Sequence, residues 1–389
     1  MIWYRVQIGA YALKKSAEKV SVDLIEKGFK TTIVKEKLLY KVRIGSFQDK
    51  AKAEKLLKRV HQYKQYEKAK ILEWNDGKDL PIIDLSPSEP PVTDYKPVIK
   101  FIAIWHTETC ESKYGDSQVF IEYAKNGIDI LHAVLIDTGM HGSDTIKKLK
   151  KLGIKTLDAV VISHAHGDHY GYLSDVLSQF KVLHLYLPGI DGLKKYQKDY
   201  AKAIQRQEEK AKKKNIPVTY LTTGGYFKIG HIECTCVYQV PADKLSEHDN
   251  HKFVNNQSIT TLFTLDSVGR VLLTGDLSNP GNKVLMQHLD KIDISADIAK
   301  CGWHGDGNAM TIDWAKFVGA PDWYWNYHHK ESKGGRSNTR KKLEKAGAKH
   351  ILRNYEDGDI TYKYCDHMWT VSTSKSKKLY SFKSKFSGN

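Results

Sequence analysis

The stretch Val161-Ile162-Ser163-His164-Ala165-His166-Gly167-Asp168-His169 decides the fold of the larger part of this chain. It follows an apolar run that predicts a short buried strand ending before the first histidine. His164 and His166 are two residues apart, so in extended backbone their side chains point to one side. Gly167 lets the chain turn, which brings Asp168 and His169 to the same space from another direction. Imidazole and carboxylate groups suit zinc, iron or manganese, so this loop predicts a site for two metal ions about 3.5–4 Å apart.

Four other segments of the sequence belong to the same pattern as this loop, by their order along the chain and by their spacing. They are Gly115-Asp116-Ser117, Leu135-Ile136-Asp137-Thr138-Gly139, Leu272-Leu273-Thr274-Gly275-Asp276 and Gly302-Trp303-His304-Gly305. Together with the His-x-His-x-Asp-His loop, these segments resemble the metallo-β-lactamase superfamily over residues 98–365. The resemblance implies an α/β fold, an αββα sandwich of two β-sheets between helices, and a metal-dependent hydrolase.

The resemblance also implies the metal ligands. The first ion would be held by His164, His166 and Asp276, and the second by Asp168, His169, Asp276 and His304. We expect two divalent ions, with zinc as the expected metal and manganese or iron as the alternatives. Asp137 is expected to orient a ligand from behind rather than to bind metal itself.

One segment departs from the superfamily pattern. Many members have a third histidine for the first ion, but this place is occupied by Val254-Asn255-Asn256-Gln257-Ser258. Asn255, Asn256 or water alone takes the position, unless His248 or His251 loops in. The Asn-Asn-Gln-Ser sequence also agrees with the hydrolase domain of bacterial competence DNA-internalisation proteins, the branch that these motifs resemble in particular.

The predicted metal centre would activate water for hydrolysis. A water that bridges two such ions loses its proton near neutral pH, and the resulting hydroxide attacks phosphorus or a carbonyl carbon. The predicted catalytic residues are Asp168, which takes or gives a proton, and His328 and His329, which donate to a phosphate or protonate a leaving group. A partly buried pair outside the site is the alternative for the two histidines. The predicted substrate-binding residues are Asn255, Asn256 and Asn338.

The N-terminal residues contain a repeat. Tyr4-Arg5-Val6-Gln7-Ile8-Gly9-Ala10-Tyr11 recurs as Tyr40-Lys41-Val42-Arg43-Ile44-Gly45-Ser46-Phe47, and the alternation in each copy predicts a half-buried strand. A charged stretch with apolar residues at helical spacing follows each copy, and two further strands are expected at residues 31–34 and 68–74. The predicted order β-α-β-β-α-β resembles the SPOR domain, a ferredoxin-like fold, over residues 1–74. The resemblance implies binding to peptidoglycan glycan strands without stem peptides; the alternative is a generic docking module.

Proline marks the boundary between two expected domains. Residues 75–97 contain five of the ten prolines of the chain, which predicts a semi-rigid linker. The expected organisation is therefore a SPOR-like domain at 1–74, a linker at 75–97 and a hydrolase domain at 98–389.

No run approaches about 20 apolar residues, so no membrane-spanning helix is expected. The five cysteines show no Cys-x-x-Cys spacing, which argues against a disulfide framework or a thiolate zinc site.

The charge and composition of the chain limit the classes of function that it can have. A hydrophobic content of 41% excludes global disorder, and the net charge of +16 favours a polyanionic partner, with solvated lysines as the alternative. The lysine-rich residues 193–214, predicted to form one long helix, are either a solvated face or a surface that follows phosphates. We expect a phosphodiesterase that acts on DNA or a cell-wall phosphodiester and is targeted to peptidoglycan. The alternatives are an amide, lactam or ester hydrolase, and a peptidoglycan-binding protein with an inactive hydrolase scaffold.

The expected location follows from the N-terminal domain. A SPOR-like domain implies the cell wall or an extracellular location, as for a phage-encoded wall enzyme. The first residues show no export signal, so the cytoplasm is the alternative. The sequence does not predict an oligomeric state.

Overall fold

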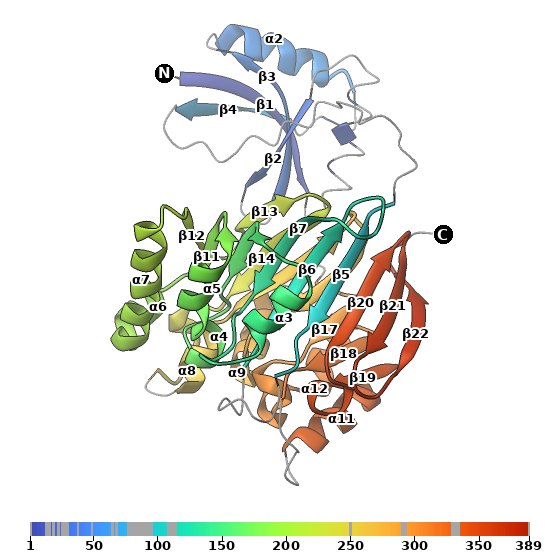
Figure 1. The fold of residues 1–389 in the computed structure, drawn as a ribbon. Coiled ribbons are helices and arrows are strands. Elements are labelled where there is room, and N and C mark those ends of the chain that lie inside the picture. Colours follow the sequence, from blue (N-terminus) through green and yellow to red (C-terminus); the bar gives the residue numbers. More distant parts are fainter. Residues whose placement is uncertain are drawn as a thin grey trace. The chain divides into compact units, whose positions relative to one another are not determined.

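The computed structural model describes residues 2–11, 17, 20–21, 24, 31–36, 39–47, 50–63, 66, 69–75, 96–106, 115–248, 251–288, 294–327 and 335–387. The chain divides into two compact units, Met1–Asp94 and Tyr95–Asn389, each of which has its own sheets (Figure 1). Most of the predicted linker lies outside the described residues; only 75, 96 and 97 fall within them. None of the helices in the described ranges is both long and apolar enough to cross a membrane.

The first unit is built around a four-stranded antiparallel sheet. The strand order is β2 (Thr31–Glu36), β3 (Leu39–Phe47), β1 (Ile2–Tyr11) and β4 (Lys70–Asn75), and α2 (Lys50–Val60) follows β3. The two copies of the repeat, β1 and β3, pair with each other at the centre, with Val6 opposite Ile44. Ala17 and Leu24, from the first predicted helix, are helical and buried in the same core as Val6. The predicted strands are therefore present, and the apolar faces of both predicted helices contribute to one core.

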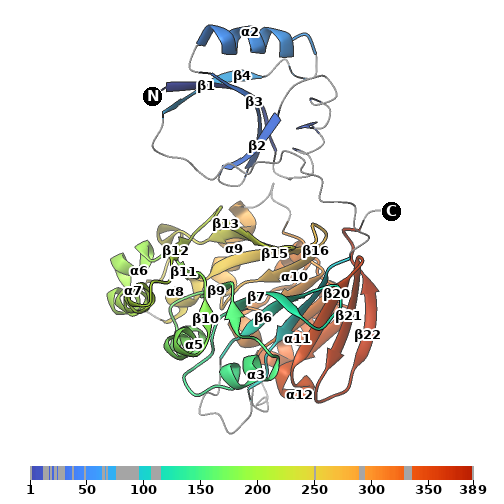
Figure 2. The same cartoon turned by 45° about the horizontal axis from the view of Figure 1, so that its top comes forward.

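The second unit contains two large sheets that lie face to face (Figure 2). The nine-stranded sheet has the order β12 (Val218–Leu221), β11 (Leu185–Pro188), β9 (Ala159–Val161), β7 (Ile130–Ile136), β6 (Gln118–Tyr123), β5 (Val98–Ala103), β20 (Ile360–Cys365), β21 (Met368–Thr373) and β22 (Leu379–Lys383). The seven-stranded sheet has the order β13 (Tyr226–Ile229), β14 (Ile232–Gln239), β15 (Ile259–Leu265), β16 (Gly269–Leu273), β17 (Ile298–Lys300), β18 (Asp322–Trp325) and β19 (His350–Arg353). A separate pair is formed by β10 (Lys181–Val182) and β8 (Thr156–Leu157).

Helices cover the outer faces of both sheets (Figure 1). The α-helices of this unit are α3 (Thr145–Lys151), α4 (Gly167–Tyr170), α5 (Leu173–Gln179), α6 (Asp191–Tyr196), α7 (Lys198–Lys213), α8 (His251–Asn256), α9 (Asn279–His288), α10 (Ile312–Val318), α11 (Gly335–Ala346) and α12 (Asn354–Asp357). The short 3-10 helices are η2 (Ala242–Lys244), η3 (Trp303–Gly305) and η4 (Gly307–Ala309). The four layers are those of the expected αββα sandwich.

Alternate residues of the central strands face two different cores. The core between the sheets includes Phe101, Phe120, Val134, Phe263 and Val271. The neighbouring positions Ile102, Val119 and Leu135 belong instead to the core that the helices cover. This alternation places apolar side chains on both faces of each sheet, as buried strands require.

Two segments are interrupted in the structure, and one of them was predicted to be a single helix. Residues 193–214 form two helices, α6 and α7, because Gln197 between them leaves the helical conformation and its amide donates to the His248 carbonyl oxygen at 2.5 Å. Residues 182–187 do not form one continuous strand either, since β10 pairs with β8 whereas β11 pairs with β9 and β12. Periodicity alone did not reveal these tertiary partners.

Candidate metal centre

One edge of the sandwich collects the predicted ligands. β7 and β9 are parallel neighbours in one sheet, and β16 and β17 are parallel neighbours in the other. The residues that follow these four strands include Asp137, 163–169, Asp276 and 301–304. Asp116 precedes β6, which is antiparallel to β7 and begins at the same edge. Segments far apart in sequence therefore meet at the carboxyl ends of parallel strands, where α/β folds commonly place ligand sites.

The loop after β9 brings its three histidines together. The His164 ring is buried, and its centroid lies 4.9 Å from that of His166 and 4.1 Å from that of His169. Asp168 and His169 lie in the short helix α4, which begins at Gly167, where the sequence predicts a turn. The cluster expected from the spacing of these residues is thus formed.

Asp276 and His304 reach the same place from the other sheet. His304 Nε2 lies 3.1 Å from Asp168 Oδ2 and 3.2 Å from Asp276 Oδ2, and His169 Nε2 lies 3.3 Å from Asp276 Oδ2. The backbone is left-handed at Trp303 and His304, with φ of 44° and 50°. This conformation costs about 1–2 kcal/mol per non-glycine residue. The fold therefore holds His304 in its position against a local preference.

The second ring nitrogen of each of these histidines faces away from the meeting point. His169 Nδ1 donates to Asp137 Oδ2 at 2.8 Å, and Asp137 also accepts from the Ser163 hydroxyl at 2.8 Å. His304 Nδ1 donates to the Asn326 carbonyl oxygen at 3.1 Å. Bonds of this kind fix the orientation of each ring, so that Nε2 faces the place where a metal ion would bind. Asp137 therefore has the supporting position that the sequence predicts.

The residues at this edge fit a divalent metal. Nε2 of His166, Nε2 of His169 and Oδ1 of Asp276 are buried and make no hydrogen bond among the described residues. Buried polar atoms are nearly always satisfied, so such atoms gathered at one point indicate a missing partner. Asp116, His169, Asp276 and His304 each offer a ligand atom within 4.8 Å of the others. Imidazole nitrogen and carboxylate oxygen are the donors that zinc, manganese and iron use.

Burial and neighbouring charges shift the pKa values of these groups, and the shifts bear on metal binding. Burial lowers the pKa of both His164 and His166, so their imidazoles are neutral near pH 7. Burial also opposes charge at His169 and His304, but nearby carboxylates, Asp276 first, raise the pKa of both rings. Burial would raise the pKa of Asp276, yet the two charged rings hold it well below its usual value. Metal binding is therefore expected to displace protons from two of the histidines.

The neighbouring residues Asn255 and Asn256 have different surroundings. Both are buried at the end of α8. Asn256 Oδ1 accepts from Ser278 N at 3.1 Å, from Ser278 Oγ at 3.0 Å and from Gly281 N at 3.2 Å, so it ties α8 to the start of α9. Asn255 lies against His166, close enough for its side-chain amide to affect the pKa of that ring. Of the two predicted substrate-binding asparagines, Asn255 is the one beside the centre.

The remaining predicted residues lie elsewhere or outside the description. Asn338 is exposed on α11, and His328 and His329 lie outside the described residues. His248, an alternative third ligand, bonds through Nε2 to the Ala242 carbonyl at 2.9 Å. His251 packs edge-on against Trp303 with a centroid separation of 5.8 Å.

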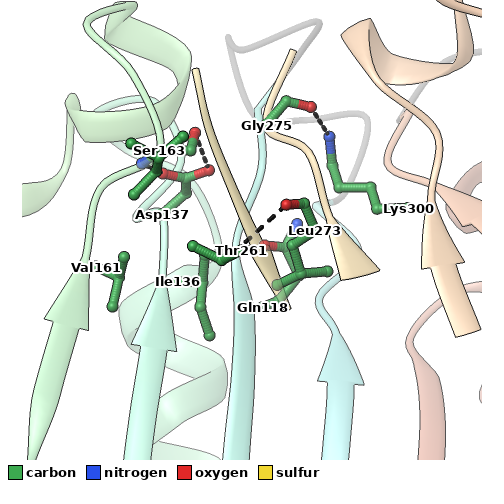
Figure 3. A pocket seen from close by; sticks show the side chains of 10 residues that line it. Gln118, Ile136, Asp137, Val161, Ser163, Thr261, Leu273, Gly275 and Lys300 are labelled. Atoms are coloured by element: carbon green, nitrogen blue, oxygen red, sulfur yellow. Dashed lines mark hydrogen bonds between the residues drawn. The ribbon is translucent and has the colours of Figure 1, made fainter. Parts of the chain in front are cut away.

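Two buried residues join the centre without having been predicted as part of it. Lys300 Nζ lies 2.5 Å from Asp116 Oδ2, and the two side chains are 1% and 0% exposed. The Gly-Asp-Ser segment was the available signal for Asp116, whereas nothing in the sequence singled out Lys300. Figure 3 shows Lys300 donating to the Gly275 carbonyl beside a cavity of about 10 Å³, with Asp137 and Ser163 on the opposite side.

Comparison with known families agrees with this geometry. Residues 132–232 match the model of the metallo-beta-lactamase superfamily, and this range includes the histidine loop; residues 4–71 match the model of the SPOR domain. The chain contains a SPOR domain and a metallo-β-lactamase superfamily domain. Both expected families and the expected fold class are therefore confirmed.

Individual relatives cover parts of the chain. Over 226 residues the chain is 25% identical to ComE operon protein 3 of Bacillus subtilis (strain 168), a match that spans 57% of this chain and 26% of that protein. The SPOR segment is similar to the peptidoglycan binding domain of the B. subtilis cell wall lytic enzyme CwlC, with 32% identity over 19% of this chain and 92% of that one and a TM-score of 0.18. A diphosphatase from the PhnP family is 14% identical over 69% of this chain and 99% of that one, with a TM-score of 0.40.

Proposed function

We propose that the metallo-β-lactamase domain is a metal-dependent phosphodiesterase for a polyanionic polymer, DNA or a cell-wall phosphodiester. We further propose that the SPOR domain binds peptidoglycan glycan strands and so directs the enzyme to the cell wall. One observation carries the catalytic proposal: the Nε2 atoms of two histidines converge with Asp168 Oδ2 and Asp276 Oδ2 at a buried edge. Zinc is the expected metal, with manganese or iron as alternatives.

The side chains around this point have separate tasks in the proposed reaction. Divalent ions bound there would supply a water of lowered pKa and positive charge for the substrate oxygens. Asp137 and the Asn326 carbonyl hold the two imidazoles with Nε2 inward. The Asp168 side chain is 19% exposed whereas that of Asp276 is 3% exposed, so Asp168 is the carboxylate that an incoming substrate meets. We assign Asp168 the proton transfer, in which its carboxylate takes a proton from the attacking water and passes it to the leaving group.

Helix α7 supports a polyanionic substrate. Its Tyr200 ring lies edge-on to His166 with a centroid separation of 5.4 Å, so the helix borders the centre. Tyr170 of α4 is close enough to both Tyr200 and Arg206 for their charges to affect its pKa. Arg206 and the nearby Lys202 are exposed on the same helix. Exposed cations beside the catalytic edge favour a surface that follows phosphates over a merely solvated face.

The substrate class is tested with two chromogenic compounds. The full chain, loaded with manganese or zinc, is expected to hydrolyse bis(p-nitrophenyl) phosphate and to leave a chromogenic cephalosporin intact. Chelation and the substitution His166→Ala should each remove the activity, because His166 offers an unpartnered Nε2 to the centre. Cephalosporin turnover without phosphodiester turnover would instead support the amide and lactam alternative.

The wall-binding proposal has its own test. Full chain and purified sacculi are sedimented together, before and after an amidase has removed the stem peptides. Stronger binding to the stripped sacculi is expected, and the His166→Ala variant should bind equally well because its change is confined to the other unit. If all the protein stays in the supernatant with both kinds of sacculi, the chain does not bind the wall and the proposal of wall targeting is wrong.

A further inference from the structure

Asp116 and Lys300 form a buried ion pair beside the candidate ligands. Their side chains come from different sheets, Asp116 from the turn before β6 and Lys300 from the end of β17. Lys300 Nζ lies 2.5 Å from Asp116 Oδ2 and 3.6 Å from Asp276 Oδ1, and it donates to the Gly275 carbonyl oxygen at 2.7 Å. Such a pair contributes little net stability, because the desolvation of both charges offsets their attraction. A reason other than stability is therefore needed for a buried lysine at this place.

The pair lies on the side of the histidines that faces away from the candidate metal position. Asp116 Oδ1 lies 3.4 Å from His304 Nδ1, and Asp116 Oδ2 lies 3.9 Å from His169 Nδ1. The Nε2 atoms of the same rings face Asp276 at 3.2 and 3.3 Å. Asp116 is thus a fourth carboxylate within reach of the cluster, but behind the rings rather than in front of them.

The backbone fixes Asp116 in this position. Its amide donates to the Asp168 carbonyl oxygen at 3.1 Å, and its carbonyl accepts from Gly139 N at 2.8 Å. Gly115 before it has a positive φ of 146°, and a Cβ there would lie 3.3 Å from the Asp168 carbonyl oxygen. These backbone contacts hold Asp116 next to the centre, so its negative charge must be balanced by a neighbouring group.

We propose that the Lys300 ammonium is a permanent cation of the metal centre. It neutralises the Asp116 carboxylate and so restricts metal ions to the side of the histidine rings that carries Nε2. This inference rests on the proposed function, since it requires that the centre binds metal. Without Lys300, Asp116 is an unpaired buried carboxylate that attracts a metal ion. Without Asp116, the ammonium is left facing Asp276 and competes with metal for that carboxylate.

The two single substitutions therefore shift metal affinity in opposite directions. Lys300→Met in the full chain is expected to raise the affinity for manganese at least about tenfold or to add a bound ion, because one buried negative charge is released. Asp116→Asn is expected to lower the affinity by about tenfold for the converse reason. Affinity is measured by competition with a chelator, and metal content is measured after gel filtration.

Thermal unfolding provides a second readout that does not depend on activity. Lys300→Met is expected to lower the midpoint of the metal-free protein by roughly 10 °C, since it leaves one buried charge unpaired. Manganese should restore most of this loss, and the double variant Lys300→Met/Asp116→Asn should restore it without metal. Lys96→Met is the matched control, because Lys96 also lies 2.5 Å from a carboxylate, Asp366, but on the surface. It should shift both midpoints by less than about 2 °C.

The results separate this inference from the proposed function. If the unsubstituted chain binds no metal, the proposed function fails. If it binds metal but both single variants lose affinity, or if the Lys300→Met loss is equal with and without metal, the role assigned to Lys300 is wrong. If Lys300→Met does not fold, Asp116→Asn and the double variant still decide the sign of the effect.

Discussion

Asn255 and Asn256 are consecutive and both buried, but their side-chain amides have different neighbours. The Asn256 amide oxygen accepts hydrogen bonds from Ser278 and Gly281 and so holds the segment after β16 against α8. The Asn255 amide instead lies beside the His166 ring and affects its pKa. One asparagine therefore supports the fold, and its neighbour faces the candidate centre.

Alanine substitutions should separate the two residues. Asn256→Ala is expected to lower the free energy of unfolding by about 1–3 kcal/mol, because it leaves buried donors of Ser278 and Gly281 without a partner. Asn255→Ala is expected to change that free energy by less than about 1 kcal/mol but to reduce phosphodiester turnover. Denaturant unfolding and the chromogenic assay measure the two effects. The opposite assignment of losses would contradict the positions described for these side chains.

Asp137 should control metal affinity without binding metal. Asp137→Asn weakens the bond that fixes the His169 ring, so we expect about 10–100-fold lower metal affinity with the fold retained. Chelator competition gives the affinity, and circular dichroism reports the fold. Asp158→Asn is the matched control, because Asp158 also bonds to a histidine, His132 Nδ1 at 3.2 Å, at the other end of β9. Equal losses in both variants would exclude the specific role of Asp137.

Arg206 should matter for polymers more than for small substrates. Arg206→Ala is expected to raise KM for a polymeric phosphodiester about three- to tenfold and to reduce its salt dependence, since one cation beside the centre is lost. Turnover of bis(p-nitrophenyl) phosphate should stay within about twofold, because that substrate does not extend along α7. Lys363→Ala removes a cation that is also exposed, but on β20, and should change neither value. An unchanged KM for every polymer tested would show that α7 is only a solvated face.

Asp322 should make stability depend on pH. Its carboxyl group accepts hydrogen bonds from Tyr362 and Tyr380, and burial raises its pKa from 3.8 to about 7. Between these two values the folded protein keeps a proton that the unfolded chain has lost, so stability falls as pH rises through this window and then levels off.

Asp322→Asn removes this titration and should flatten the profile. Relative to the variant, the unsubstituted chain is expected to lose up to about 4 kcal/mol between pH 4 and pH 7. Free energies of unfolding at intervals of half a pH unit provide the comparison. Parallel profiles for the two proteins would show that Asp322 does not titrate in this window.

Local spacing is sufficient to predict much of the centre. His164, His166, Asp168 and His169 lie within one loop, so their common direction depends only on backbone geometry. The apolar runs that lead to Asp276 and to the loop are equally visible in the sequence. These features need no knowledge of distant neighbours.

Contacts between the two sheets could not be predicted from the sequence. The Asp116–Lys300 pair depends on β6 beginning and β17 ending at one edge, and no periodicity encodes that relation. The two asparagines look alike in sequence because their difference lies in which one faces Ser278. The break at Gln197 has the same origin, since its partner is the carbonyl of His248, 51 residues away.

The proposed function is tested most directly by a metal titration of the metal-free full chain, with turnover of bis(p-nitrophenyl) phosphate followed at each addition. We predict that activity rises with manganese or zinc, reaches its plateau at two ions per chain and is abolished by His166→Ala. A protein that binds no metal, or one that fills with metal and cleaves no phosphodiester, would contradict the proposed function.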